Sequence, residues 1–60
     1  MVEMEDIILD IWCEHVNGTV TEMEDGIVFL DAPDDTYVYD SKAEAVDDCL
    51  YTIRQWLKEA

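Results

Sequence analysis

The first 41 residues of the chain contain twelve carboxylates and not one lysine or arginine. The three cations, Lys42, Arg54 and Lys58, all lie in the last third, and the formal net charge is −13 over 60 residues. Repulsion between these like charges lowers the stability of a compact, folded state. Half of the residues are nevertheless apolar and six are aromatic. This is enough for one small core, so we expect a single acidic domain over residues 1–60.

The sign of the charge also limits the partners. A strongly negative field repels nucleic acid and anionic membranes and attracts basic surfaces. The N-terminus is acidic where a signal peptide needs positive charge, and no apolar run approaches the roughly 20 residues that span a bilayer. Two cysteines are too few for a disulfide scaffold. We therefore expect a cytoplasmic protein with reduced, mostly buried thiols at Cys13 and Cys49.

Two segments have the periodicity of helices. Residues 3–16 space their polar side chains by three or four, which makes one stripe on a helix, and Asn17-Gly18 supplies a C-terminal stop. The second helix begins with a capping box, because Glu44 follows the N-cap residue Ser41 by three positions. The expected buried faces are Met4, Ile7, Ile8, Ile11, Trp12 and His15 in the first helix, and Val46, Cys49, Leu50, Ile53, Trp56 and Leu57 in the second. We expect Trp12, Leu50, Ile53 and Trp56 to share one core.

The segment between the helices favours three strands. Thr and Val residues around the hairpin signal Asp25-Gly26 indicate strands at about 19–24 and 27–32. A turn at 33–35 then precedes a strand over 36–40. The predicted fold is α+β in the order αβββα, a three-stranded antiparallel meander with two helices packed on one face. Double-stranded-RNA-binding domains share this order, but they need basic residues at the start of the last helix, where this chain has Asp47 and Asp48.

Catalytic and metal-binding patterns are missing. The single histidine, His15, falls on the apolar face of the first helix, and Cys13 lies two residues away on another side, so the two do not form a nucleophile–base pair. The aspartates lack the spacing of a calcium loop, and so short a chain has little room for a pocket of about 300 Å³ or more. We expect no metal, no cofactor and no enzymatic activity.

Regular rows of carboxylates are the most informative surface feature. Alternate residues on a strand lie about 6.7 Å apart, and acids spaced by three or four climb about 5 to 6 Å along a helix. A nucleic-acid duplex likewise presents negative charges at fixed spacing. The helix dipole already accounts for Glu44, Asp47 and Asp48, so Asp47 and Asp48 are only the third choice for partner contacts. The expected partner-binding acids are Glu22, Glu24 and Asp25 along the first hairpin and Asp31, Asp34, Asp35 and Asp40 around the next turn, followed by the helical row Glu3, Asp6, Asp10 and Glu14.

In size, charge and a start at Met1, the whole chain resembles the small acidic proteins with which phages and mobile elements inhibit host defence, above all anti-CRISPR proteins that mimic DNA. This resemblance is one of composition and does not rest on a motif. It implies a basic nucleic-acid-binding protein as partner, with a CRISPR effector subunit favoured, in the cytoplasm of the host cell. An anti-restriction protein or a DNA-glycosylase inhibitor would be a related case.

An excess of acids also arises for two reasons that do not involve DNA. An antitoxin or a regulatory subunit would use the acids to cap a basic partner protein. Adaptation to high salt would spread acids over all exposed positions. The lack of lysine over 41 residues fits such adaptation, whereas the many large apolar residues fit it less well.

The apolar residues of the sheet have two roles available. Tyr37 and Tyr39 share one face of a strand, with Val38 on the other. Either both tyrosines belong to the core, or one of them is a contact anchor beside the acids, since tyrosine is favoured at binding hot spots. Residues 27–32 are apolar on both faces. The face without helices could therefore serve as a homodimer interface or as the apolar part of a partner site.

Overall fold

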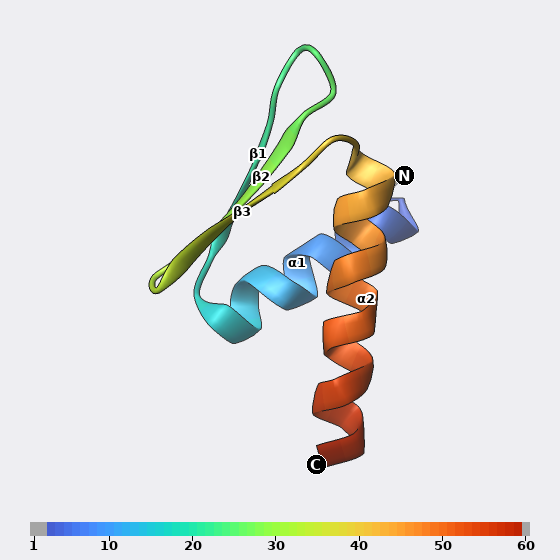
Figure 1. The fold of residues 1–60 in the computed structure, drawn as a ribbon. Coiled ribbons are helices and arrows are strands. Elements are labelled where there is room, and N and C mark those ends of the chain that lie inside the picture. The colour runs from blue at the N-terminus through green and yellow to red at the C-terminus, as the bar shows by residue number, and fades with distance from the viewer. Residues whose placement is uncertain (1–2, 60) are drawn as a thin grey trace.

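The computed structural model describes residues 3–59 and contains two helices and a three-stranded antiparallel sheet (Figure 1). The sheet order β1-β2-β3 makes it a meander, and both helices lie on the same side of it. The predicted αβββα fold is confirmed, although β1 ends earlier than expected. The elements are α1 (Met4–Val16), β1 (Thr19–Glu22), β2 (Val28–Ala32), β3 (Asp35–Tyr39) and α2 (Lys42–Glu59).

Helix α1 ends where the sequence predicted. At its start the carbonyl of Glu3 accepts a hydrogen bond from the amide of Asp6 at 3.1 Å. At its end Asn17 takes the left-handed conformation, with φ of 60°, and the amide of Gly18 donates to the carbonyl of Cys13 at 2.9 Å. Asparagine is the residue other than glycine that most readily takes this conformation at a helix end. The left-handed position is thus occupied by Asn17 and not by the glycine.

Gly18 has a different role, which is close packing. A β-carbon at this position would lie 2.9 Å from Cζ3 of Trp12 and still closer to the carbonyl oxygen of Asp31. The backbone of the α1–β1 connection therefore passes directly over the ring of Trp12 and against β2. Only glycine leaves room for this approach.

The two hairpins have different turns. In the β1–β2 hairpin the amide of Gly26 donates to the carbonyl of Met23 at 3.1 Å, and the amide of Met23 donates to the carbonyl of Ile27 at 2.8 Å. Gly26 has φ of 96°, as a three-residue hairpin loop requires at this position. The β2–β3 hairpin closes over Pro33 and Asp34 alone, since Ala32 pairs with Asp35.

Helix α2 begins with the predicted serine cap. The Ser41 hydroxyl accepts a hydrogen bond from the amide of Glu44 at 3.3 Å, and the Ser41 carbonyl accepts one from the amide of Ala45 at 3.2 Å. These bonds satisfy two donors that a helix start otherwise leaves unpaired. Glu44 in the first turn and Lys58 in the last suit the helix dipole.

The buried core joins both helices to the central strand. Side chains alternate between the two faces of β2, so Val28 and Leu30 point toward the helices and Phe29 points away. The fully buried residues are Leu9, Trp12, Val28, Leu30, Ala45, Val46 and Cys49.

The predicted apolar face of α1 is partly wrong. Ile7 and Ile11 are exposed, and Met4 is 69% exposed, whereas Leu9, which the prediction left out, is buried beside Trp12. Helix α1 is apolar over more than one face, and the fold covers only the face that carries Leu9 and Trp12. The helix is therefore rotated by about one residue, or about 100°, from the predicted orientation.

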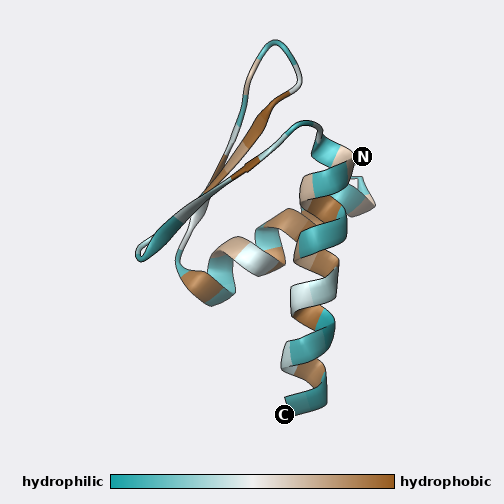
Figure 2. Cartoon of the chain, in the orientation of Figure 1, coloured by the Kyte–Doolittle hydropathy of each residue, from teal (hydrophilic) through white to brown (hydrophobic). Residues whose placement is uncertain are grey.

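The predicted face of α2 is correct only in its first half. Val46 and Cys49 are buried, but Leu50, Ile53 and Trp56 are half-buried, and Leu57 is 72% exposed. The second half of α2 extends past the sheet and past α1 (Figure 1), and hydrophobic segments continue along this part (Figure 2). No element of residues 3–59 reaches far enough to cover them completely. The predicted core is therefore too large. Of the four residues expected to share it, Trp12 is buried, whereas Leu50, Ile53 and Trp56 are half-buried.

Replacement of Gly18 by alanine should destabilise the protein by about 1 to 3 kcal/mol, the usual range for overpacking. The added methyl group would collide with backbone of β2, which cannot move aside cheaply. Urea unfolding followed by tryptophan fluorescence measures the change. An unfolding free energy within about 0.5 kcal/mol of the parent would show that Gly18 is not tightly packed.

Truncation of Trp12 to alanine should cost about 3 to 5 kcal/mol, because it empties the centre of the core. Leu57→Ala is the matched control, since Leu57 lies on the predicted stripe but is mostly exposed. Thermal unfolding by circular dichroism should show a large loss for the first variant and a change near zero for the second. Equal melting temperatures would refute the core described above.

Candidate functional site

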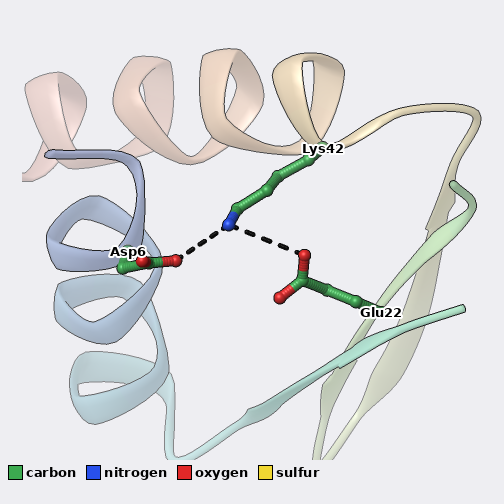
Figure 3. A network of polar contacts seen from close by, with 3 residues as sticks. All are labelled: Asp6, Glu22 and Lys42. Atoms are coloured by element: carbon green, nitrogen blue, oxygen red, sulfur yellow. Dashed lines mark hydrogen bonds and ion pairs between the residues drawn. The ribbon is translucent and has the colours of Figure 1, made fainter. Parts of the chain in front are cut away.

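The carboxylates of this protein lie at its surface and are largely uncompensated. All sixteen fall within the described residues, and each is exposed or half-buried. Lys42 is the one cation that forms ion pairs within residues 3–59: its Nζ lies 2.9 Å from Oδ1 of Asp6 and 3.6 Å from Oε1 of Glu22 (Figure 3). Fourteen of the sixteen carboxylates therefore have no cationic partner in the described part of the chain.

Lys42 connects three elements of the fold. It extends from the first turn of α2 to Asp6 on α1 and to Glu22 at the end of β1 (Figure 3). The hydrogen bond to Asp6 raises the pKa of the Lys42 ammonium, and the Coulombic attraction of Asp6 and Glu22 acts in the same direction. Asp6 and Glu22 therefore have a structural role, which makes them weaker candidates for partner contacts.

The predicted hairpin acids divide into two groups at opposite ends of the sheet. Val28 pairs with both Glu22 and Tyr39, so Asp40, the next residue, lies at the same end as Glu22. The expectation that Asp40 surrounds the β2–β3 turn is wrong. Four residue steps of β2, about 13 Å at about 3.3 Å per step, separate the ends. Glu22, Glu24, Asp25 and Asp40 lie at one end, and Asp31, Asp34 and Asp35 lie at the other.

Some of these acids also stabilise turns. Asp25 Oδ1 accepts a hydrogen bond from the amide of Ile27 at 3.1 Å, and Asp35 Oδ1 accepts one from the amide of Thr36 at 2.9 Å. Asp31 Oδ1 accepts one from the Thr36 hydroxyl at 3.0 Å. The strand face predicted for Glu22 and Glu24 is not formed, because β1 ends at Glu22 and Glu24 lies in the loop. Glu22, Asp31 and Asp35 lie in three different strands and the other hairpin acids lie outside the strands, so no single regular strand holds these carboxylates.

The acidic row predicted for the first helix is formed except for Asp6, with Glu3 at the N-cap position just before α1. Glu3, Asp10 and Glu14 are exposed, and their spacing of seven and four places them on one side of the helix. Asp6 is half-buried and bound to Lys42. The row available to a partner is therefore Glu3, Asp10 and Glu14.

Tyr37 and Tyr39 line a hollow between the sheet and the helices. Its volume is about 300 Å³, at the lower end of the range for ligand pockets, whereas the length of the chain led us to expect little room for one. The sheet contributes the two tyrosines with Leu30 and Ala32, α1 contributes Trp12 and Val16, and α2 contributes Asp48, Cys49, Thr52 and Trp56. Buried Leu30 and Cys49 form the floor.

Aromatic rings dominate the walls of this aromatic hollow. The rings of Trp12 and Tyr37 meet edge to face, with centroids 6.4 Å apart and planes at 82°. The ring of His15 stacks on Trp56 at 3.8 Å, which supports Trp56. The Tyr39 hydroxyl donates a hydrogen bond to Oδ2 of Asp48. Tyr39 packs against the core, as expected if the tyrosines belong to it, whereas Tyr37 is exposed.

Sequence reasoning missed Trp56 as a site residue and ranked Asp48, with Asp47, only third among the partner-binding acids. The helix dipole alone explained an acid at position 48, and an expected place in the core alone explained a tryptophan at position 56. The spacing 48, 52, 56 does place the two on one side of α2 together with Thr52. The sequence could not show that this side faces the tyrosines of β3.

The two thiols are free and unreactive. Burial is the main cause that raises the pKa of the Cys49 thiol to about 11, with smaller contributions from Asp48 and Cys13. Burial, and then Asp10, raises the pKa of Cys13. Both thiols therefore stay protonated at neutral pH, and neither is activated as a nucleophile.

Comparisons with known proteins do not place the chain in a family. No protein-family model matches it, and neither the curated proteins nor the solved structures contain a match. Within residues 3–59, no helix is long and apolar enough to cross a membrane, and no three His, Cys, Asp or Glu side chains come together as metal ligands. The candidate site consists of the uncompensated carboxylates and the aromatic hollow.

Replacement of Lys42 by methionine should lower the melting temperature, because it leaves Asp6 and Glu22 without their cation. Lys58→Met is the matched control, since Lys58 forms no ion pair in the described residues. The difference between the variants should shrink in 1 M NaCl, where the screening length falls from about 10 Å to about 3 Å. Equal melting temperatures at low salt would show that the ion pairs do not stabilise the fold.

Proposed function

We propose that this protein is an inhibitor, and not an enzyme, that binds the nucleic-acid-binding surface of another protein and occupies it in place of DNA. The observation that carries the proposal is that fourteen of sixteen carboxylates have no cationic partner within residues 3–59. A surface of this kind is costly in self-repulsion. A basic partner surface would relieve that cost.

The density of charge supports mimicry of a duplex. The long dimension of the molecule is 37 Å. Double-stranded DNA of that length carries about 22 phosphates, since it has one charge per about 1.7 Å. The net charge of −13 is more than half of that value on a folded surface of similar length.

The arrangement of the charge supports the same function. Carboxylates lie at both ends of the sheet, about 13 Å apart along β2, and in a further row on α1. Strands, turns and a helix hold their backbones, so a partner would meet them with little loss of chain entropy. In the class of inhibitor that we propose, the target is a basic DNA channel or PAM-reading surface of a CRISPR effector in the host cytoplasm.

The test begins with a captured target. The tagged protein is used to retain binding proteins from a lysate of the cells that express it, after nuclease treatment. The retained protein is purified, and its binding to labelled duplex DNA is measured by fluorescence anisotropy with increasing inhibitor. Competition for one site supports the proposal. Retention of a small basic toxin that does not bind nucleic acid would replace it with the antitoxin function.

Charge reversals should then locate the contact surface. Three double variants each change the net charge by four: Asp34→Lys/Asp35→Lys, Glu24→Lys/Asp40→Lys and Glu3→Lys/Asp10→Lys. Exposed residues without a structural role change stability by about 0.5 kcal/mol at most, whereas Asp35→Lys also removes the hydrogen bond from the Thr36 amide. Like charges against a basic groove cost several kcal/mol, so we expect the variant at the docked surface to lose more than a hundredfold in inhibition of DNA binding.

The three variants control one another, because their net charges are equal. An unequal loss identifies a docked surface, and an equal loss identifies long-range steering by the net charge. Melting temperatures at or above that of the parent would show that the fold is retained. Full inhibition by all three variants would contradict mimicry and leave the acids as solubilising charge.

A further inference from the structure

We propose that the aromatic hollow binds the guanidinium group of an arginine that projects from the basic partner. The identity of the partner rests on the proposed function, whereas the chemistry of the hollow is a property of this chain. Three observations carry the inference: the rings around the hollow, the carboxylate at its mouth and the field of the whole molecule.

The walls of the hollow suit a flat cation. Trp12, Tyr37, Tyr39 and Trp56 contribute rings from β3, α1 and α2. The faces of such rings carry negative electrostatic potential, and an arginine within about 6 Å of a ring centroid is attracted to it. The hollow is about 300 Å³, which is the share of roughly ten water molecules at about 30 Å³ each. A guanidinium group with part of its aliphatic stem fits within that space.

Asp48 supplies the one carboxylate that lines the hollow, and only one of its two oxygens accepts a hydrogen bond within residues 3–59. The Tyr39 hydroxyl donates to Oδ2 of Asp48, and Oδ1 has no hydrogen-bond partner within residues 3–59. Burial, and then the bond to Asp48, raises the pKa of the Tyr39 phenol, so this donor stays protonated at neutral pH. Asp48 and Tyr37 are both exposed residues, so the free acceptor belongs to the side of the hollow that is open to solvent.

Arginine suits this site better than lysine. Its planar group can stack on a ring and donate to a carboxylate at the same time, whereas the lysine ammonium is a compact, strongly hydrated point charge. The net charge of −13 favours any cation over a neutral ligand. A hollow that served packing alone would be filled by aliphatic side chains. Besides Val16, Leu30 and Ala32, this hollow is lined by four aromatic rings and a carboxylate.

The test uses a single amino-acid probe and no partner protein. N-acetyl-arginine amide is titrated into the ¹⁵N-labelled protein at 0.15 M NaCl, and the indole signals of Trp12 and Trp56 are followed by NMR. N-acetyl-citrulline amide, which has nearly the same shape and no charge, is the control ligand. We expect saturable shifts of both indoles with arginine at millimolar concentration and no saturation with citrulline. Equal binding of the two ligands would overturn the proposal.

Two variants test the residues. Asp48→Asn keeps an acceptor for Tyr39 and removes the charge, and we expect it to weaken arginine binding at least tenfold. Asp47→Asn makes the same change one residue earlier, outside the hollow, and should bind nearly as the parent does. Equal losses in the two variants would show a response to net charge and overturn the site. Tyr37→Leu, which removes an exposed ring, should also weaken binding, and parent-like binding would exclude that ring from the site.

A further probe tests the assignment to arginine. Tetramethylammonium that bound more tightly than the arginine probe would overturn it, because a planar donor would then have no advantage. The titration involves neither DNA nor the captured target. Its failure would leave the mimicry proposal standing, and failure of DNA competition would leave the arginine site standing.

Discussion

Seven buried apolar side chains form the core that holds this fold together, and no carboxylate is among them. This constraint shapes the rest of the structure. Val28 and Leu30 of the central strand form the covered face of the sheet, and both helices pack on it. The close approach of Gly18 to Trp12 and to β2 lies where the chain passes from α1 to β1.

A core of this size leaves much apolar surface uncovered. Met4 and Ile11 on α1 and Leu57 on α2 remain exposed, and the second half of α2 has no sheet beneath it (Figure 1). The same geometry creates the aromatic hollow. Rings of β3 and α2 line the space that is left between the sheet and the helices.

The two parts of the candidate site would act at different distances. Uncompensated carboxylates attract a basic surface over about a Debye length and mainly accelerate association. The aromatic hollow acts only at contact, where a cation loses water and meets a ring. Charge alone would attract many basic proteins. A shaped site for one arginine would add the specificity that a diffuse field lacks.

Much of the architecture follows from local features of the sequence. The cap at Ser41, the stop at Asn17-Gly18 and the hairpin at Asp25-Gly26 act within a few residues, so propensity and turn chemistry predict them. The exposure of the acids follows equally from the cost of burying charge. The tertiary structure alone decided which face of α1 is buried, because Ile7, Ile11, Leu9 and Trp12 are all apolar and periodicity cannot rank them. It also decided that Asp40 lies far from the β2–β3 turn and that Asp48 lies beside Tyr39. These placements depend on strand register and helix rotation, which arise from packing between segments that are distant in the sequence.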